Sequence, residues 1–85
     1  MNEKLEALKL ETSAFKVLCF LTFKEVQFKP SQIAKAIGEK PSTVRARLTE
    51  LKNMGLVAPG ESGYYTTVTP YDILMKIYRQ TQKLM

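Results

Sequence analysis

The sequence contains no histidine and a single cysteine, Cys19. Histidine is the commonest metal ligand and general base in proteins, and one thiol can neither close an internal disulfide nor complete a zinc site. Phosphate-binding glycine loops, dinucleotide fingerprints and nucleophile elbows are also missing from the sequence. We therefore expect no enzyme, no cofactor and no metal site. Cys19 lies in an apolar helical stretch and is expected to be a small core side chain rather than a redox sensor.

Long apolar runs are absent as well. The longest, FKVLCFLTF, is interrupted by lysine and threonine and is far shorter than a bilayer-spanning helix. The first residues, MNEKLEALKLE, are amphipathic and acidic in part, unlike a signal peptide with a basic start and an apolar middle. These features predict a cytoplasmic protein without a membrane partner.

What the sequence does have is basic charge, concentrated in one region. The 85 residues include 13 Lys and Arg against 8 Asp and Glu, which gives a net charge of +5. Most of the excess lies between Lys24 and Lys52, in the middle third of the chain. The length and the 45% hydrophobic share suit one small globular domain, and the basic balance favours a polyanionic partner.

Apolar periodicity and turn residues divide the chain into an N-terminal extension and five predicted elements. Proline suits the first position of a helix, and glycine commonly follows its last turn. Between the last two helices, short β-prone runs flank a turn that contains Pro59 and Gly63. The predicted order is an N-terminal extension over 1–10, helices over 12–25, 30–37 and 41–54, a hairpin over 56–69 and a helix over 70–85. Residues 1–10 either form a short separate helix or extend the next one.

The tripeptide KPS occurs at the start of two of these helices. If Pro30 and Pro41 hold the first helical positions, Lys29 and Lys40 are the cap residues, although a lysine side chain cannot accept hydrogen bonds from helix amides. The charge of each lysine also adds to the positive end of the helix dipole. In the alternative interpretation the serines that follow the prolines are the caps. Under the first interpretation, each helix start combines amides, dipole and a lysine into a phosphate site.

The run IAKAIGEKPSTVRARLTELKNMGLV, from Ile33 to Val57, resembles the core motif of MarR-like, ArsR-like and related winged-helix regulators. The shared features are an aliphatic residue followed by glycine, the PSTV helix start, two inward leucines, and the GLV that leads into the wing. The resemblance extends over about Leu10 to Ile77. It implies an α+β, mostly α, winged helix-turn-helix fold with a three-helix core, a wing of two or three short strands and a C-terminal helix. It also implies a sequence-specific double-stranded DNA-binding regulator, expected to be a repressor, with the helix at 41–54 in the major groove.

Candidate DNA contacts follow from the helix at 41–54. If Val44, Leu48 and Leu51 face inward, small polar residues and an arginine face outward, and arginine can donate two hydrogen bonds to guanine. The resemblance places base contacts on the first two turns of this helix. We predict base contacts by Ser42, Arg45, Ala46 and Thr49, and phosphate contacts by Lys29, Ser31, Lys35, Lys40, Thr43, Arg47 and Lys52. Arg47 points sideways and can meet either a phosphate or a carboxylate of its own helix, and the alternative for the whole surface is an ordinary solvated helix face.

The predicted wing, PGESGYY, carries Glu61 and no basic residue. Arginine reading of the minor groove from this wing is therefore excluded. Ser62 and Tyr64 are the candidate contacts to the DNA backbone, and the alternative is a structural hairpin whose tyrosines pack locally.

The terminal segments are longer than a minimal winged helix requires, and small domains gain stability by association. We predict a two-fold homodimer through Leu5, Leu8, Ile77, Leu84 and Met85; the alternative is that these segments cover the monomer's own core. The last predicted helix would carry its apolar face on Ile73, Leu74, Ile77, Thr81 and Leu84. Two other functions stay open at this point: a winged-helix protein-interaction module, and a sequence-tolerant nucleic-acid-binding protein.

Overall fold

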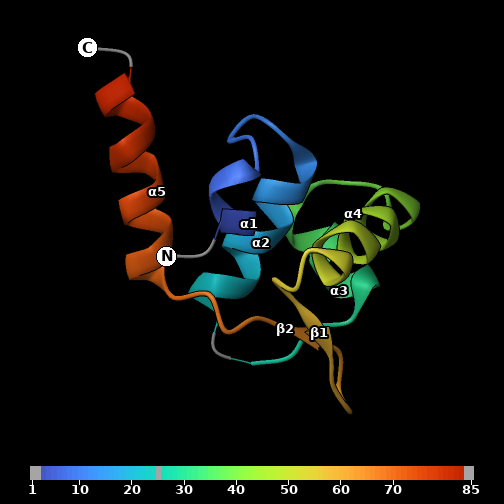
Figure 1. Cartoon of the computed structure of the whole chain (residues 1–85). Helices are drawn as coiled ribbons and strands as arrows, with labels where there is room; N and C mark the ends of the chain where they lie inside the picture. The colour runs from blue at the N-terminus through green and yellow to red at the C-terminus, as the bar shows by residue number, and fades with distance from the viewer. Residues whose placement is uncertain (1–2, 25, 84–85) are drawn as a thin grey trace.

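The computed structural model describes residues 3–24 and 26–83. It is mostly helical with one small antiparallel sheet, which confirms the predicted fold class (Figure 1). The elements are α1 (Glu3–Ala7), α2 (Ser13–Phe23), α3 (Pro30–Ile37), α4 (Pro41–Asn53), β1 (Ala58–Pro59), β2 (Tyr64–Tyr65) and α5 (Pro70–Lys83).

Two helices begin at threonine caps. The hydroxyl oxygen of Thr12 accepts a hydrogen bond from the backbone amide of Phe15 at 3.2 Å and starts α2. At α5 the arrangement is reciprocal: Thr69 Oγ1 accepts from the amide of Asp72 at 3.1 Å, and Asp72 Oδ2 accepts from the amide of Thr69 at 3.0 Å. Two amides at the start of α5 are thereby satisfied by side chains.

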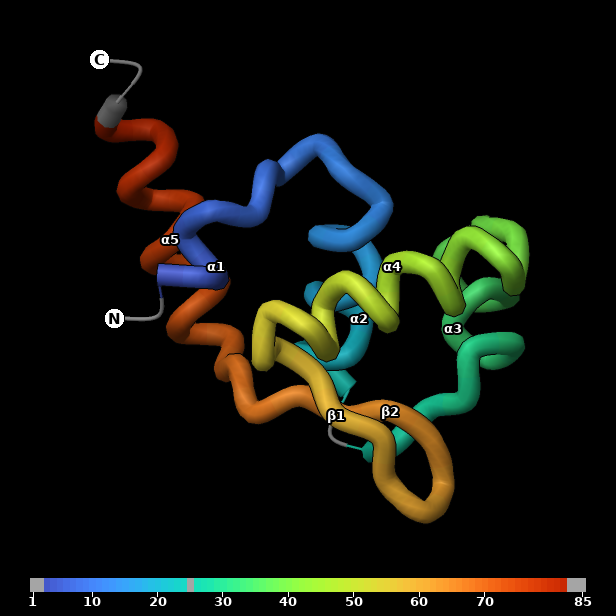
Figure 2. The backbone as a smooth tube through the Cα atoms, turned by 45° about the vertical axis from the view of Figure 1, so that its right-hand side comes forward, coloured from blue at the N-terminus to red at the C-terminus, as the bar shows by residue number. Residues whose placement is uncertain are grey.

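The helix-turn-helix consists of α3 and α4. Gly38 ends α3 in the left-handed conformation, with φ of 72°, and the chain re-enters a helix at Pro41. Helix α4 packs against both α2 and α3. This pair of helices lies on the opposite side of the molecule from α5 in both views (Figures 1 and 2).

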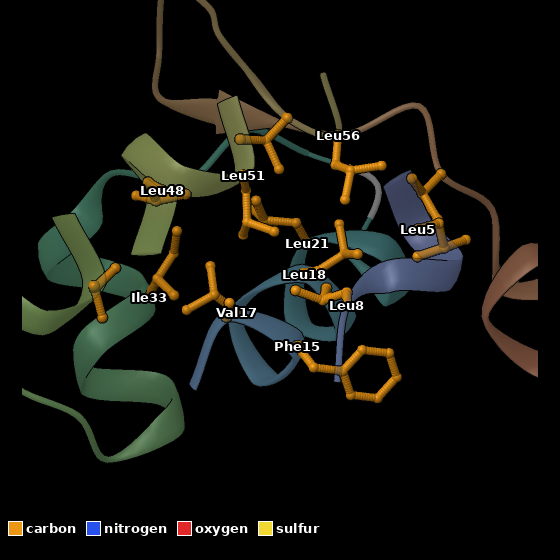
Figure 3. Close-up of a cluster of buried hydrophobic side chains, with 14 of the residues drawn as sticks. Leu5, Leu8, Phe15, Val17, Leu18, Leu21, Ile33, Leu48, Leu51 and Leu56 are labelled. Atoms are coloured by element: carbon orange, nitrogen blue, oxygen red, sulfur yellow. The ribbon is translucent and has the colours of Figure 1, made fainter. Parts of the chain in front are cut away.

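The core lies between α2, α3 and α4 (Figure 3). Val44, Leu48 and Leu51 of α4 are completely buried, as is Ile33 of α3. The inward face predicted for the helix at 41–54 is therefore confirmed. Its opposite side is left free for another molecule.

The wing is shorter than the sequence suggests. β1 pairs with β2 through Ala58 opposite Tyr65 and Pro59 opposite Tyr64, and Phe28 adds a single bridge to Tyr64. Beyond this short ladder, Thr66 Oγ1 donates to the carbonyl of Leu56 at 2.6 Å. A side-chain hydrogen bond therefore joins the two arms of the hairpin where the backbone pairing ends.

Gly63 is required where the hairpin crosses the segment before α3. Its φ is 144°, and a Cβ at this position would collide with the backbone of Phe28. Any larger residue would push the hairpin away from that segment.

Helix α1 covers the chain's own core. Leu5 and Leu8 are 3% and 8% exposed and belong to the central apolar cluster (Figure 3). The prediction that these two leucines form a dimer interface was wrong, because they are already buried within one subunit. Leu84 and Met85, also predicted at that interface, lie outside the described residues.

Helix α5 packs on the body through a face that differs from the predicted one. Ile73 and Lys76 are buried, whereas Leu74 is 62% and Ile77 38% exposed. The Lys76 ammonium donates to the carbonyl of Glu6 at 3.2 Å and lies 6.0 Å from the ring centre of Phe15. A long apolar stem with a polar end suits this buried position better than a purely apolar residue would.

Candidate nucleic-acid interface

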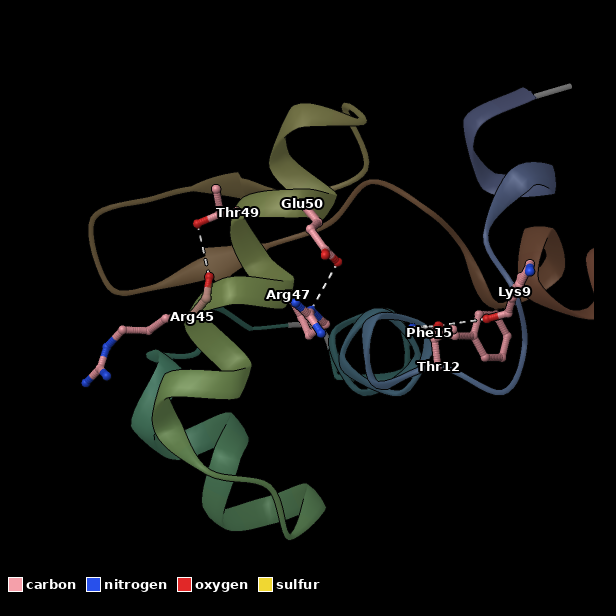
Figure 4. Close-up of polar contacts among 7 residues, drawn as sticks. All are labelled: Lys9, Thr12, Phe15, Arg45, Arg47, Thr49 and Glu50. Atoms are coloured by element: carbon pink, nitrogen blue, oxygen red, sulfur yellow. Dashed lines mark hydrogen bonds and ion pairs between the residues drawn. The ribbon is translucent and has the colours of Figure 1, made fainter.

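The outward side of α4 presents the four residues predicted to contact bases. Ser42, Arg45, Ala46 and Thr49 are all exposed. The Arg45 side chain extends away from α2 and from the rest of the fold (Figure 4). The helix can approach a DNA groove closely, because Ser42, Ala46 and Thr49 are small. Arg45 is the one long side chain among them and can donate two hydrogen bonds to a base.

Thr49 is already committed to one hydrogen bond. Its hydroxyl donates to the backbone carbonyl of Arg45 at 3.0 Å (Figure 4). The hydroxyl proton is thereby used within α4, and only the lone pairs of the oxygen remain free. In this state Thr49 can accept a hydrogen bond from a base amino group but cannot donate one.

The Arg47 side chain is half-buried and is not directed toward solvent on the outward side of α4 (Figure 4). Its Nε is shielded from solvent and lies 3.0 Å from Oε2 of Glu50, in an ion pair rather than an aligned hydrogen bond. Its side chain points toward α2 (Figure 4). Of the two possibilities left open for Arg47, the structure of the free chain has the carboxylate of its own helix.

The other residues predicted as phosphate contacts form a set around α3 and α4. Within the described residues their side chains make no ion pair. The exposed members are Lys29, Ser31, Lys35, Lys40 and Lys52, and Thr43 is half-buried. The basic side chains around the helix-turn-helix are therefore accessible to a polyanion.

Lys29 and Lys40 are the cap residues of α3 and α4. Both have extended backbone conformations with φ of −76° and −72°, proline follows at the first helical position, and neither side chain caps its helix. The serines of the two KPS tripeptides lie within the first turns, which excludes them as caps. The first-turn amides left for an anion are few, because Pro30 and Pro41 carry no N–H and the Lys29 amide donates to Gln32. They are those of Ser31 in α3 and of Ser42 and Thr43 in α4.

Two acidic side chains of this surface are paired with cations, and sequence analysis anticipated only one of the two pairs. Glu39, beside Lys40, pairs with Lys16 of α2 at 3.2 Å, and Glu50 pairs with Arg47. Pairing reduces the repulsion that these carboxylates would exert on phosphate. Lys16 could not be found from sequence because it is 23 residues away from Glu39 and on another helix.

The wing contributes little beyond its backbone. Ser62 is exposed at the tip, and its amide donates to Oε1 of Gln27 at 2.8 Å. Tyr64 is half-buried against the core and belongs to the bridge with Phe28. Ser62 thus keeps an accessible hydroxyl, while Tyr64 has a structural role in holding the hairpin.

Cys19 is half-buried against the core, where burial raises the pKa of its thiol. Across residues 3–24 and 26–83, histidine, cysteine and carboxylate side chains form no group of three that could hold a metal ion. None of the helices in these segments has the length and apolar character needed to cross a membrane.

A three-helix core, a β-hairpin wing, and an exposed polar helix face surrounded by lysines define a winged helix-turn-helix DNA-binding protein. Residues 15–82 match a family model described as "Winged helix-turn-helix transcription repressor, HrcA DNA-binding". The chain belongs to this family. It is a DNA-binding transcriptional repressor, and the MarR-like or ArsR-like subfamily named by resemblance is not supported. Comparisons with curated proteins and with solved structures find no match.

Proposed function

We propose that this repressor recognises a specific operator by inserting α4 into the major groove. The observation that carries the proposal is the exposed face of Ser42, Arg45, Ala46 and Thr49, backed by a fully buried inward face on the same helix. Burial on one side keeps the helix rigid while the other side reads base edges. Arg45 would select guanine, and Thr49 would accept from an adenine or cytosine amino group.

Phosphate contacts would come from the two lysine-capped helix starts. Each combines the positive end of a helix dipole with a lysine and with the first-turn amides that the chain does not use, one at α3 and two at α4, which together suit one phosphate group. Lys29 and Lys40 would fix the register of α4 on the duplex, and Lys35 and Lys52 would add further charge. These contacts carry no sequence information of their own.

The operator would be pseudo-palindromic and bound by a homodimer. Two recognition helices related by a two-fold axis would enter major grooves that are one helical turn, or a multiple of it, apart. Occupation of that site would block transcription. No part of this arrangement depends on Leu5 or Leu8, which are buried within one subunit.

Selection of bound fragments from random duplex DNA, followed by a salt series on the selected site, tests the proposal. A specific repressor should enrich an inverted repeat and bind it about 10³-fold or more tightly than random duplex. Steep salt dependence without discrimination would indicate sequence-tolerant binding through lysines alone. Absence of duplex binding would favour a protein-interaction module and overturn the proposal.

A further inference from the structure

The outer face of α5 is apolar and unoccupied. Tyr71, Leu74 and Tyr78 are each more than half exposed, and Ile77 is 38% exposed. Phe23, at the end of α2, is 60% exposed and lines the same surface. Single exposed apolar residues are normal, but a contiguous group of this kind marks a site of association.

The charged side chains next to this face are used by the chain itself. Asp72 caps α5 through the amide of Thr69, Lys76 is buried with its ammonium on the Glu6 carbonyl, and Arg79 pairs with the Glu6 carboxylate at 2.8 Å. The residues named above that form the outer face of α5 are all uncharged. A neutral apolar face complements another copy of itself and offers nothing to attract a charged partner such as DNA.

The face also contains a hollow of about 310 Å³. Its lining includes Pro70, Ile73, Leu74 and Ile77, which are spaced i, i+3, i+4 and i+7 along α5. Four residues at this spacing form the hole that receives one side chain of a facing helix in knobs-into-holes packing. Tyr78, one position beyond the hollow, supplies a large side chain on the same helix.

We propose that two copies of the chain associate by packing their α5 helices antiparallel about a two-fold axis, with Tyr78 of each copy in the hollow of the other. The inference deepens the proposed function, on which it rests, by naming the surface that forms the dimeric repressor. An isologous interface requires reciprocal contacts, so the axis lies midway between the hollow and the tyrosine. In this register Leu74 of one copy faces Ile77 of the other.

This interface leaves the DNA surface free. Helices α3 and α4 lie on the opposite side of the molecule from α5 in both views (Figures 1 and 2). Dimerisation and duplex binding therefore use separate surfaces and can be measured separately.

Charge complementation across the pair tests both the surface and the register. Leu74→Lys and Ile77→Glu alone should each raise the dimer dissociation constant at least about tenfold, because each places an unpaired charge in an apolar contact. Mixing the two variants should restore association as a heterodimer. The introduced lysine of one copy would then face the introduced glutamate of the other. At the second, symmetry-related contact the native Ile77 and Leu74 would still meet. Analytical ultracentrifugation of each variant and of the equimolar mixture gives the readout, with circular dichroism to verify folding.

Ala36→Lys provides the matched control, since it adds a lysine at an exposed position of α3 and should leave association unchanged. If the wild-type chain is still a monomer at about 100 µM, its dimer dissociation constant is too high for specific association, and the proposal is overturned. Unchanged association in Leu74→Lys would exclude this face, and failure of the mixture to associate would exclude the register.

Duplex binding distinguishes this inference from the proposed function. The Leu74→Lys variant should still bind a single half-site like the wild-type subunit while losing its preference for the inverted repeat. If the wild-type chain dimerises through α5 but selects no duplex, the proposed operator recognition fails while the interface stands. If it selects duplex as a monomer, the interface fails while recognition stands.

Discussion

The backbone amide of Lys29 donates a 2.8 Å hydrogen bond to Oε1 of Gln32, while the Lys29 side chain caps nothing. This is one half of a capping box, in which the third helical residue satisfies the cap amide. The other half needs an acceptor on the cap side chain, and an ammonium group has none. The start of α3 therefore lacks a stabilising bond that a serine would supply.

Replacing Lys29 and Lys40 with serine should stabilise the fold and weaken DNA binding. Each serine would gain a cap bond of about 0.5–2 kcal/mol and relieve the repulsion between the lysine and the helix dipole. The melting temperature should rise by about 4–8 °C for each kcal/mol gained. Duplex affinity should fall, and the slope of log affinity against log salt should become shallower by about 0.9 for each lost phosphate contact.

Lys9→Ser is the control for these variants because it removes one exposed positive charge from the loop before α2, away from α4 (Figure 4). It should leave the salt slope closer to wild type than either cap variant does. A lower melting temperature in the cap variants would contradict the account of the lysines.

Arg45→Ala should change specificity, whereas Lys29→Ala should change only affinity. Loss of a bidentate contact to guanine costs about 1–3 kcal/mol and relaxes preference at one base pair. The Thr49 hydroxyl bonds to the backbone of Arg45, so that bond survives the substitution and the local helix should stay intact. Binding of a set of single-base operator variants to both mutants provides the measurement; equal losses of specificity would contradict the assigned roles.

Local features of the helix-turn-helix could be predicted from sequence because they depend on short-range chemistry. The helix predicted over 30–37 coincides with Pro30–Ile37, and the inward triad of α4 is completely buried. Proline at a helix start, glycine at its end and leucines at spacings of three and four residues act within one or two turns. Such signals need no knowledge of the rest of the fold.

The packing of the terminal helices could not be predicted in the same way. Apolar periodicity put Leu74 and Ile77 on the inward face of α5, yet Lys76 takes a buried position because Phe15 and the Glu6 carbonyl receive its stem and ammonium. These partners lie near the other end of the chain, far outside the range of any helical periodicity. Leu5 and Leu8 were misassigned for a related reason, since an amphipathic segment looks the same whether it covers its own core or a partner.

Thr69→Ala should destabilise the fold without affecting the DNA surface. Thr69 and Asp72 satisfy each other's amides at the start of α5, and removal of a threonine cap typically costs about 0.5–2 kcal/mol. Denaturant unfolding should show this loss, whereas Thr67→Ala, at an exposed position nearby, should be close to neutral. Equal stability of the two variants would mean that α5 does not depend on its cap.

Arg47→Ala should leave the salt dependence of duplex binding almost unchanged, in contrast to Lys35→Ala. The Arg47 guanidinium is held by Glu50 and directed toward α2, so the substitution removes a largely surface ion pair worth about 0.2–1 kcal/mol of stability and no phosphate contact. Lys35 is exposed and makes no ion pair within the described residues, and its loss should reduce the slope by about 0.9. Fluorescence anisotropy with a labelled operator over a salt series compares the two variants directly. A slope reduced as much by Arg47→Ala as by Lys35→Ala would show that Arg47 exchanges Glu50 for a phosphate on binding, and that the pairing seen in the free protein is broken by DNA.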